Sequence, residues 1–199
     1  MALTLDYRPL KFQDVVNQSH IIDILQAQVD QDNLNNNYLF FGPRGTGKTT
    51  TARLLTRVAN CLDPVDNSPC NECENCKAIL EEKTLDFVEI DAASHTGVDN
   101  IRQEILEKAN YKPNQLKKKV YVIDEVHMLS KGAFNALLKI MEEPPEYLMF
   151  ILATTEINKV PETIISRSQV FNFKKLSIED IVGRLEYIAD NENIDYTKD

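Results

Sequence analysis

The stretch Tyr38-Leu39-Phe40-Phe41-Gly42-Pro43-Arg44-Gly45-Thr46-Gly47-Lys48-Thr49-Thr50 joins a short apolar run, a glycine-bearing loop and a helix start. It predicts a P-loop, because glycines let consecutive backbone N–H groups converge on the phosphates of a nucleotide. Residues 42–50 are the predicted contacts, with Lys48 reaching the β and γ phosphates and Thr49 offering its hydroxyl to Mg²⁺. A helix over residues 48–60 would point its positive N-terminal end at the same anion. The alternative is a glycine-rich turn without a ligand.

The composition indicates a globular protein. The chain has 199 residues, 43% of them hydrophobic, enough for one core and the beginning of a second, small domain. No apolar run approaches the ~20 residues that span a bilayer, and residues 1–6 lack a basic region followed by an apolar stretch. We therefore expect a cytoplasmic protein without membrane contact. The net charge of −9 means that any nucleic-acid contact must come from a local basic or helix-terminal surface.

All four cysteines lie in an insertion at residues 60–77, spaced Cys61-x8-Cys70-x2-Cys73-x2-Cys76. Two overlapping C-x2-C spacings let neighbouring sulfurs reach one tetrahedral ion, so the cluster predicts a structural Zn²⁺ site with four thiolates. Disulfides are one alternative, disfavoured in a reducing cytosol. A C-x2-C redox pair is another, but redox chemistry does not require four cysteines.

A β-rich segment at residues 119–125 ends in two acids, Asp124 and Glu125. Asp124 can hold the Mg²⁺ water shell, and Glu125 can orient and polarise the water that attacks the γ phosphate. A solvated turn is the alternative for an isolated Asp-Glu pair, but this pair lies downstream of a P-loop.

Strand and helix segments alternate along the chain, which predicts a doubly wound α/β domain. Further helices are expected at residues 19–31, 98–111, 132–143 and 161–168, and further strands at residues 86–91, 148–153 and 170–173. Residues 32–37 are expected to form a surface turn. The pattern becomes helical again after Ser177, where Ser-x-x-Asp is a capping signal. We expect one domain over residues 1–175 and the beginning of a second, helical domain over 176–199.

Several motifs together closely resemble the AAA+ clamp-loader ATPases. They are the P-loop, Val120 to His127, Met128-Leu129-Ser130, Phe134 to Lys139, Glu142-Glu143-Pro144-Pro145, Leu152-Ala153-Thr154-Thr155 and Ser166-Arg167. With the cysteine cluster and Asp91-Ala92-Ala93-Ser94, the resemblance narrows to the gamma/tau family of bacterial DNA polymerase III and covers about residues 7–183. It implies an AAA+ P-loop NTPase domain with a parallel five-stranded sheet, a zinc-knuckle insertion and the start of a helical lid domain.

The resemblance also implies a function. Such a chain would be an ATP-driven motor that opens a ring-shaped sliding clamp and closes it around primer-template DNA, without polymerising DNA itself. Its cofactors would be ATP, Mg²⁺ and Zn²⁺. Its partners would be other clamp-loader subunits, the sliding clamp and primer-template DNA.

Further site residues follow from the resemblance alone. Thr155 would sense the γ phosphate, and Arg167 would be an arginine finger reaching the ATP of a neighbouring subunit; an ordinary surface arginine is the alternative. The adenine and ribose pocket would be lined by Arg8, Pro9, Val15 and Val16, of which the two valines could instead be core. DNA would be contacted by Ser94, His95, Thr96, Arg102, Ser130 and Lys131, for which solvated helix caps are the alternative.

The sequence departs from the family pattern at two positions. Asn17 replaces a usual glycine, and we expect the loop to survive because asparagine tolerates a left-handed backbone. Ser168 replaces the cysteine after the finger arginine. Because the chain ends inside the lid region, we expect a fragment or truncated product with an intact ATP site and incomplete assembly. Two other functions compete: an ATP-binding scaffold without useful hydrolysis, and another AAA+ motor such as a Holliday-junction helicase.

Overall fold

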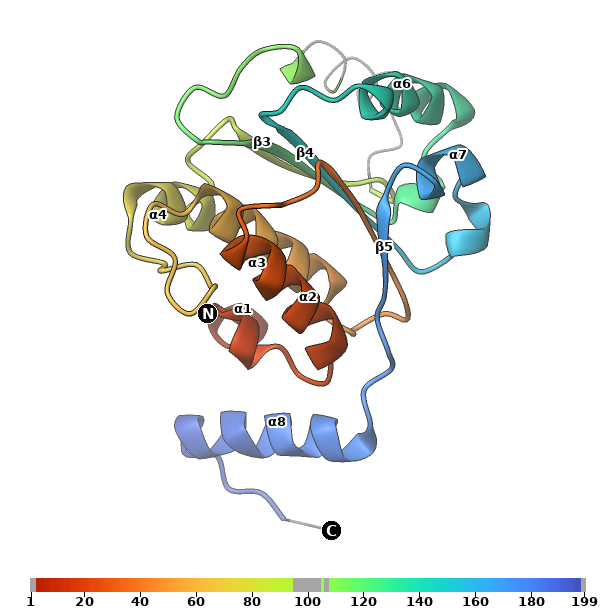
Figure 1. The fold of residues 1–199 in the computed structure, drawn as a ribbon. Coiled ribbons are helices and arrows are strands. Elements are labelled where there is room, and N and C mark those ends of the chain that lie inside the picture. Colours follow the sequence, from red (N-terminus) through yellow and green to blue (C-terminus); the bar gives the residue numbers. More distant parts are fainter. Residues whose placement is uncertain (1–2, 95–104, 106–107, 198–199) are drawn as a thin grey trace.

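The computed structural model describes residues 3–94, 105 and 108–197. Its centre is a sheet of five parallel strands in the order β2-β3-β4-β1-β5 (Figure 1). The strands are β1 (Asn37–Phe41), β2 (Phe87–Asp91), β3 (Lys119–Asp124), β4 (Leu148–Thr154) and β5 (Gln169–Asn172). The predicted parallel five-stranded sheet and α/β class are therefore confirmed.

Helices flank the sheet on both faces (Figure 1). The α-helices are α1 (Leu3–Asp6), α2 (Ser19–Asp30), α3 (Lys48–Asn60), α4 (Glu74–Leu80), α6 (Lys131–Glu142), α7 (Glu162–Ile165) and α8 (Ile178–Glu192). Short 3-10 turns η1 (Phe12–Asp14), η2 (Val126–Met128) and η3 (Ile157–Lys159) connect them. No helix in the described ranges is both long and apolar enough to cross a membrane.

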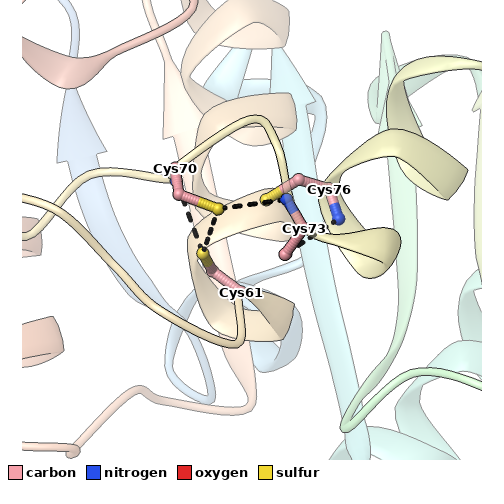
Figure 2. Close-up of side chains that lie close together, drawn as sticks. All are labelled: Cys61, Cys70, Cys73 and Cys76. Carbon is pink, nitrogen blue, oxygen red and sulfur yellow. Dashed lines mark hydrogen bonds between the residues drawn. The ribbon is translucent and has the colours of Figure 1, made fainter.

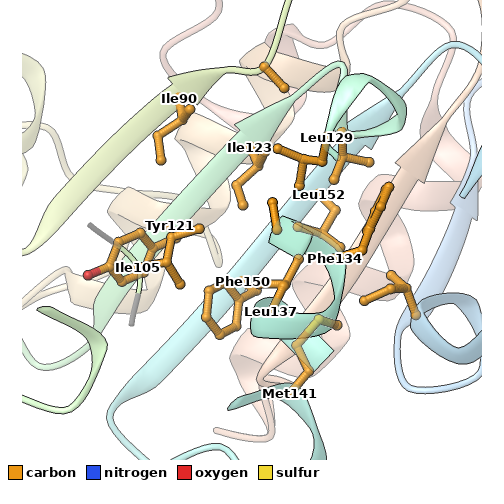
Figure 3. Packing of buried hydrophobic residues seen from close by; sticks show 14 of the residues in the cluster. Ile90, Ile105, Tyr121, Ile123, Leu129, Phe134, Leu137, Met141, Phe150 and Leu152 are labelled. Carbon is orange, nitrogen blue, oxygen red and sulfur yellow. The ribbon is translucent and has the colours of Figure 1, made fainter. Parts of the chain in front are cut away.

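Side chains that alternate along each strand build two cores, one on each face of the sheet. On β3, Tyr121 and Ile123 join the core that lies beneath α6, shown in Figure 3. The intervening Val120 and Val122 join the core that lies beneath α2 and α3. Burial on both faces explains why β4 is continuously apolar, as a parallel sheet covered by helices requires.

The strand order decides where the functional segments meet. Strand β4 lies between β1 and β3, so three parallel strands deliver their carboxyl ends to one edge of the sheet. Thr154 pairs with Phe41 at the end of β1, and Leu152 pairs with Ile123 near the end of β3. The P-loop, the residue after β4 and the acidic pair at the end of β3 therefore share one edge.

Several expected boundaries differ from the structure. Asn37, expected in a surface turn, is buried as the first residue of β1, where its backbone joins the ladder beside Phe150. Its Nδ2 donates to the carbonyls of Met141 and Arg167, each at 3.2 Å, which satisfies the donor half of the buried amide, whereas its Oδ1 has no hydrogen-bond partner among the described residues. The helix expected over residues 161–168 is only the single turn α7. Most of the helix expected at residues 98–111 lies outside the described residues.

Helix α8 lies apart from the sheet, beside α1 (Figure 1). Ser177 caps it in the predicted manner, with its Oγ accepting from the backbone N–H of Asp180 at 3.1 Å. Asn17 adopts the left-handed backbone that was expected, at a φ of 56°, and its Nδ2 donates to Asp180 Oδ2 at 2.6 Å. Arg184 on α8 also donates to the carbonyl of Tyr7 at 2.6 Å. The division into residues 1–175 and 176–199 stays a prediction.

Candidate nucleotide site and metal centre

The loop between β1 and α3 has the backbone of a phosphate-binding loop. Gly42 has a φ of 151°, and a Cβ there would lie only 2.3 Å from the carbonyl oxygen of Phe173, so no other residue fits. Gly47 has a φ of 94° and is the N-cap of α3. The loop therefore ends where the N-terminal N–H groups of a 13-residue helix are free to meet an anion.

Lys48 is the first residue of α3 and is largely buried. Its Nζ donates to the carbonyls of Gly42 and Pro43, both at 2.8 Å, so the ammonium lies over its own loop. Burial lowers the pKa of Lys48, and the negative charges of Asp124 and Glu125 oppose that shift. A cation held by two neutral carbonyls is available to a phosphate group.

Thr49 and Asp124 meet across the edge of the sheet. The Thr49 hydroxyl donates to Asp124 Oδ2 at 2.5 Å, although the two residues are 75 positions apart. A hydroxyl and a carboxylate are oxygen donors of the kind that Mg²⁺ accepts alongside water and phosphate oxygens. The residues present therefore fit a magnesium–nucleotide site, and they are the pair predicted for it.

Glu125 turns toward the residue after β4. Its backbone is left-handed, with a φ of 48°, and this conformation follows directly on the end of β3. Glu125 Oε2 accepts from the Thr155 hydroxyl at 3.0 Å and from the Thr155 backbone N–H at 3.3 Å. Arg44 Nε from the P-loop lies 3.5 Å from Glu125 Oε1. The structure thus brings both predicted residues, Glu125 and Thr155, into direct contact.

His127 also lies beside Glu125. The sequence analysis named it only as the end of the motif from Val120 to His127 and gave it no role at the site. Its side chain is 6% exposed, and its Nδ1 lies 2.9 Å from Thr154 Oγ1 and 3.4 Å from Glu125 Oε2. Its Nε2 lies 3.4 Å from Glu156 Oε1. The only sequence signal was its position three residues after Asp124, because the contact depends on how η2 folds back on β4.

A cavity of about 560 Å³ opens at this edge of the sheet. It is lined by Arg8, Arg44, Gly45, Gly47, Lys48, Thr49, Thr50, Asp91, Ala93, Asp124 and Glu125. Asp91 is the last residue of β2, and Ala93 comes two residues later. The sequence motif that contains them indicated the family but did not place them at the nucleotide site. Burial lowers the pKa of Arg8, and the positive charge of Arg53 lowers it further.

The other residues predicted for the nucleotide do not line this cavity. Pro9 lines a neighbouring cavity of about 300 Å³. Val15 Cγ1 would lie 3.9 Å from a Cβ on Gly47, so this half-buried side chain borders the P-loop, and Val16 is also half-buried. Thr46 stays within the loop, where its hydroxyl donates to the Pro43 carbonyl at 2.9 Å.

Arg167 lies away from the cavity. It follows α7, and its guanidinium contacts Glu142 Oε1 and the carbonyl of Thr163, each at 3.0 Å.

The residues proposed to meet DNA are only partly described. Ser130 is the N-cap of α6, where its Oγ accepts from Ala133 N–H at 3.1 Å, and Lys131 is exposed beside it. Ser94 is also exposed. The other three, His95, Thr96 and Arg102, lie outside the described residues.

The four cysteine sulfurs converge on one point at the opposite end of α3 (Figure 2). They all lie within 4.8 Å of one another. A tetrahedral ion with Zn–S bonds of ~2.3 Å requires sulfurs about 3.8 Å apart, so the arrangement fits Zn²⁺. All four cysteines of the chain are free, which is contrary to the disulfide alternative.

Backbone N–H groups point at these sulfurs. Cys61 Sγ accepts from Cys70 N–H, Cys70 Sγ from Cys73 N–H, and Cys73 Sγ from Cys76 N–H, each at 3.4 Å. Burial raises the pKa of the Cys61 and Cys76 thiols. At Cys73 burial acts in the same direction, but the N–H groups of Leu62 and Cys76 outweigh it and lower the pKa to about 7. Donors aimed at sulfur favour thiolates, the form that binds metal.

The sequence of this chain is similar to subunits of DNA polymerase III. The sequence profile of a family described as "DNA polymerase III, delta subunit" matches residues 17–177. Over 97% of its length, the chain is 52% identical to DNA polymerase III subunit tau of Bacillus subtilis, of which it covers 34%. It is 50% identical to subunit tau/gamma of Haemophilus influenzae, with 98% of this chain and 28% of the relative covered. For subunit tau of Escherichia coli the identity is 45%, with 97% and 30% covered.

Solved structures show the same fold. A DNA polymerase III gamma subunit-related protein of Thermotoga maritima superposes with a TM-score of 0.55 at 22% identity, covering 79% of this chain and 46% of that chain. The RuvB Holliday junction branch migration motor of Thermotoga maritima gives a TM-score of 0.62 at 17% identity, covering 94% and 55%. These likenesses concern the fold alone.

The chain spans about a third of the length of the curated relatives named above. The relatives are named tau or tau/gamma, whereas the matching profile carries the name of the delta subunit. The chain therefore belongs to the family described as DNA polymerase III, delta subunit, and its sequence resembles the tau and gamma subunits of that polymerase.

Proposed function

We propose that this chain is the ATPase portion of a clamp-loader motor subunit, which binds and hydrolyses ATP to load a sliding clamp onto primer-template DNA. The observation that carries the proposal is the meeting of three segments at one edge of the sheet. Lys48 lies over the P-loop, Thr49 donates to Asp124, and Thr155 donates to Glu125. The likeness to tau and gamma subunits supports the replicative role.

Each residue has a chemical task in ATP hydrolysis. The Lys48 ammonium neutralises charge on the β and γ phosphates, and the P-loop N–H groups hold them in place. Thr49 and Asp124 would hold Mg²⁺, which screens phosphate charge when bound. The Glu125 carboxylate accepts a hydrogen bond from the attacking water and aligns it with the phosphorus–oxygen bond that breaks to release ADP. The Thr155 hydroxyl positions that carboxylate, because the two are in contact.

The remaining predicted residues complete the proposal. Arg8, Pro9, Val15 and Val16 would surround the adenine and ribose beside the P-loop. Arg167 would act on the ATP of a neighbouring subunit, which agrees with its position outside this chain's own cavity.

DNA contacts would be made by the exposed residues near the start of α6 and after β2, together with His95, Thr96 and Arg102. Such contacts position the duplex backbone without reading its sequence.

The cysteine cluster is proposed to hold one structural Zn²⁺. All four ligands come from the chain itself, so no coordination position is left for substrate. Cys61 directly follows the last residue of α3, and Cys73 is the N-cap of α4. The ion would therefore join the ends of two helices.

The test is a clamp-loading assay with the full-length subunit assembled with its partners on primed circular DNA. Wild-type protein is expected to load the clamp with ATP. Glu125→Gln should bind ATP but load little clamp within the time of one wild-type turnover, because water activation is lost while phosphate contacts remain. Glu146→Gln, an exposed glutamate at the far edge of the sheet, is the matched control. Loading by Glu125→Gln at the wild-type rate would contradict the proposal.

A further inference from the structure

Arg57, in the last turn of α3, is a buried cation without an acidic partner among the described residues. The residue is 3% exposed. Within the described ranges, no carboxylate lies within ion-pair distance of its guanidinium, and its Nε has no hydrogen-bond partner. A buried charge is costly unless another charge or a set of hydrogen bonds compensates it. The nucleotide site does not use Arg57, so its compensation must lie elsewhere.

The hydrogen-bond partner of Arg57 lies in the cysteine cluster, although Arg57 also lines the cavity of about 300 Å³ beside Pro9. Its Nη1 donates to Asn71 Oδ1 at 2.5 Å, and Asn71 lies inside the C-x2-C turn between Cys70 and Cys73. Asn71 has a left-handed backbone, with a φ of 63°, and its backbone N–H opposes the rise that burial causes in the pKa of the Cys76 thiol. The Asn71 side chain is thus held at its Oδ1 by Arg57 and at its Nδ2 by the carbonyls of Leu10 and Pro69, each at 3.1 Å, while its backbone lies beside a predicted metal ligand.

Electrostatics point to the same partner. Burial lowers the pKa of Arg57 to about 10, the charge of Arg53 adds to that shift, and the Cys76 sulfur opposes it. Four thiolates around one Zn²⁺ carry two net negative charges. A buried guanidinium beside such a centre supplies positive charge that the ligands themselves do not provide.

We propose that Arg57 is the internal counter-cation of the four-thiolate centre and positions its second turn. It would strengthen zinc binding in two ways, by offsetting thiolate charge and by holding Asn71 so that its N–H faces Cys76. The inference rests on the proposed zinc site. Because Arg57 and Lys48 lie on the same helix, zinc binding would also fix the far end of the helix that begins at the P-loop.

An arginine in the last turn of a helix also interacts with the helix dipole. That contribution does not depend on metal. Zinc affinity therefore separates the two roles, because a helix-end effect alone would stabilise the metal-free and metal-bound forms equally.

The experiment measures zinc affinity by equilibrium competition with a chromophoric chelator on the full chain. Arg57→Met removes the charge and keeps an apolar stem. It is expected to weaken zinc binding ~10–100-fold, the range found for second-layer partners of metal ligands. Arg53→Met is the matched control one turn earlier, where the arginine pairs with Glu89 at 2.6 Å, and it should leave zinc affinity unchanged.

Asn71→Gly is a second variant that leaves α3 intact. Glycine keeps the left-handed turn and the N–H to Cys76 but removes the acceptor for Arg57. It should weaken zinc binding in the same direction as Arg57→Met, and it decides the matter if Arg57→Met does not fold. Cobalt substitution adds an independent readout, since the sulfur-to-cobalt charge-transfer bands of both variants should shift from those of the wild type.

Three results would contradict the inference. Wild-type zinc affinity and unchanged cobalt bands in both variants would overturn it while leaving the zinc site standing. So would equal weakening by Arg53→Met and Arg57→Met, because the effect would then not be specific to the buried guanidinium. Wild-type protein without metal after chelator-free purification would overturn the zinc site and this inference with it.

Discussion

The two ends of α3 differ in how their surroundings are built. At its N-terminal end, Lys48 and Thr49 face a cavity of about 560 Å³ whose other walls come from distant strands. At its C-terminal end, Cys61 joins a cluster whose four ligands lie within a 16-residue stretch of the same chain. An open site can exchange substrate, whereas a closed one can only stabilise structure. In the proposed function, one helix thus joins a site for chemistry to a site for stability.

Two carboxylates, Asp86 before β2 and Glu125 after β3, show the same contrast between fixed and exchangeable surroundings. Buried Asp86, before β2, accepts backbone N–H groups from residues 114–116 at 2.7–3.0 Å, and these donors cannot rotate away. Glu125 instead meets mostly side chains, those of Thr155, Arg44 and His127. The first carboxylate is fixed, whereas the partners of the second can be exchanged for substrate and water.

The largest expected effect concerns Arg167, which we propose acts on the ATP site of a neighbouring subunit. In an assembled complex, Arg167→Ala should lower ATP turnover at the neighbouring subunit's site, because a guanidinium that neutralises developing phosphoryl charge is worth ~10³–10⁵ in rate. Lys48→Ala would be placed either on the Arg167→Ala subunit or on its neighbour, so that each mixture leaves one identified site active, whose turnover is measured.

Arg167→Lys is the matched variant, since it keeps the charge but loses the planar fork, and it should restore little activity. Loss confined to the mutated subunit's own site would show that Arg167 acts in cis. The nucleotide site at the N-terminal end of α3 would then not depend on another subunit, and its contrast with the self-contained cysteine cluster would be weaker.

A substitution in the cysteine cluster should lower the stability of the protein and leave its ATP affinity unchanged. Cys73→Ser is expected to abolish stoichiometric zinc and to lower the free energy of unfolding by more than about 4 kcal/mol, as loss of a structural metal does. Zinc content and denaturant titration measure both quantities. Asp63→Asn, an exposed change in the same insertion, is the control. A folded Cys73→Ser protein that has lost ATP affinity would show that the two ends are not separate.

A smaller effect concerns Asp86 and depends on pH. Burial by itself would raise its pKa, but the N–H groups of Gln115, Asn114 and Leu116 outweigh burial and lower it. A carboxyl with a lowered folded pKa stabilises the fold above its unfolded pKa of ~3.9. That stability is lost as the pH falls through the folded value.

Asp86→Asn should therefore cost ~1–3 kcal/mol at pH 7, because an amide cannot accept all of these N–H groups. The difference from wild type should shrink as the pH falls below ~4. Urea unfolding at several pH values measures it. A difference that does not change with pH would mean that the charge of Asp86 is not what stabilises this edge.

The fold and the meeting of the predicted residues at one edge of the sheet followed from the sequence because their signals are local. The P-loop glycines, the apolar β4 and the acids after β3 each fix a strand end, and parallel strands bring such ends to one edge. The cysteine spacing predicted a cluster for the same reason, since its ligands are close in the chain.

Residues whose roles depend on distant packing were missed. His127 contacts Thr154 only because η2 folds against β4, and Asn37 is buried only because two distant carbonyls meet its amide. Arg57 looks like an ordinary helix residue until its burial and its bond to Asn71 are seen. Single positions of this kind have no period or spacing that a sequence could reveal.

The central claim is that Lys48 binds ATP and Glu125 hydrolyses it, and one paired measurement tests it most directly. ATP affinity of the chain and turnover in the assembled complex would be measured for Lys48→Ala, Glu125→Gln and, as a control, the exposed Lys112→Ala. We predict that Lys48→Ala loses ATP binding. Glu125→Gln should keep wild-type affinity and lose ~10²–10⁴ in turnover. Equal loss of ATP binding in both variants, or full turnover by Glu125→Gln, would contradict the account.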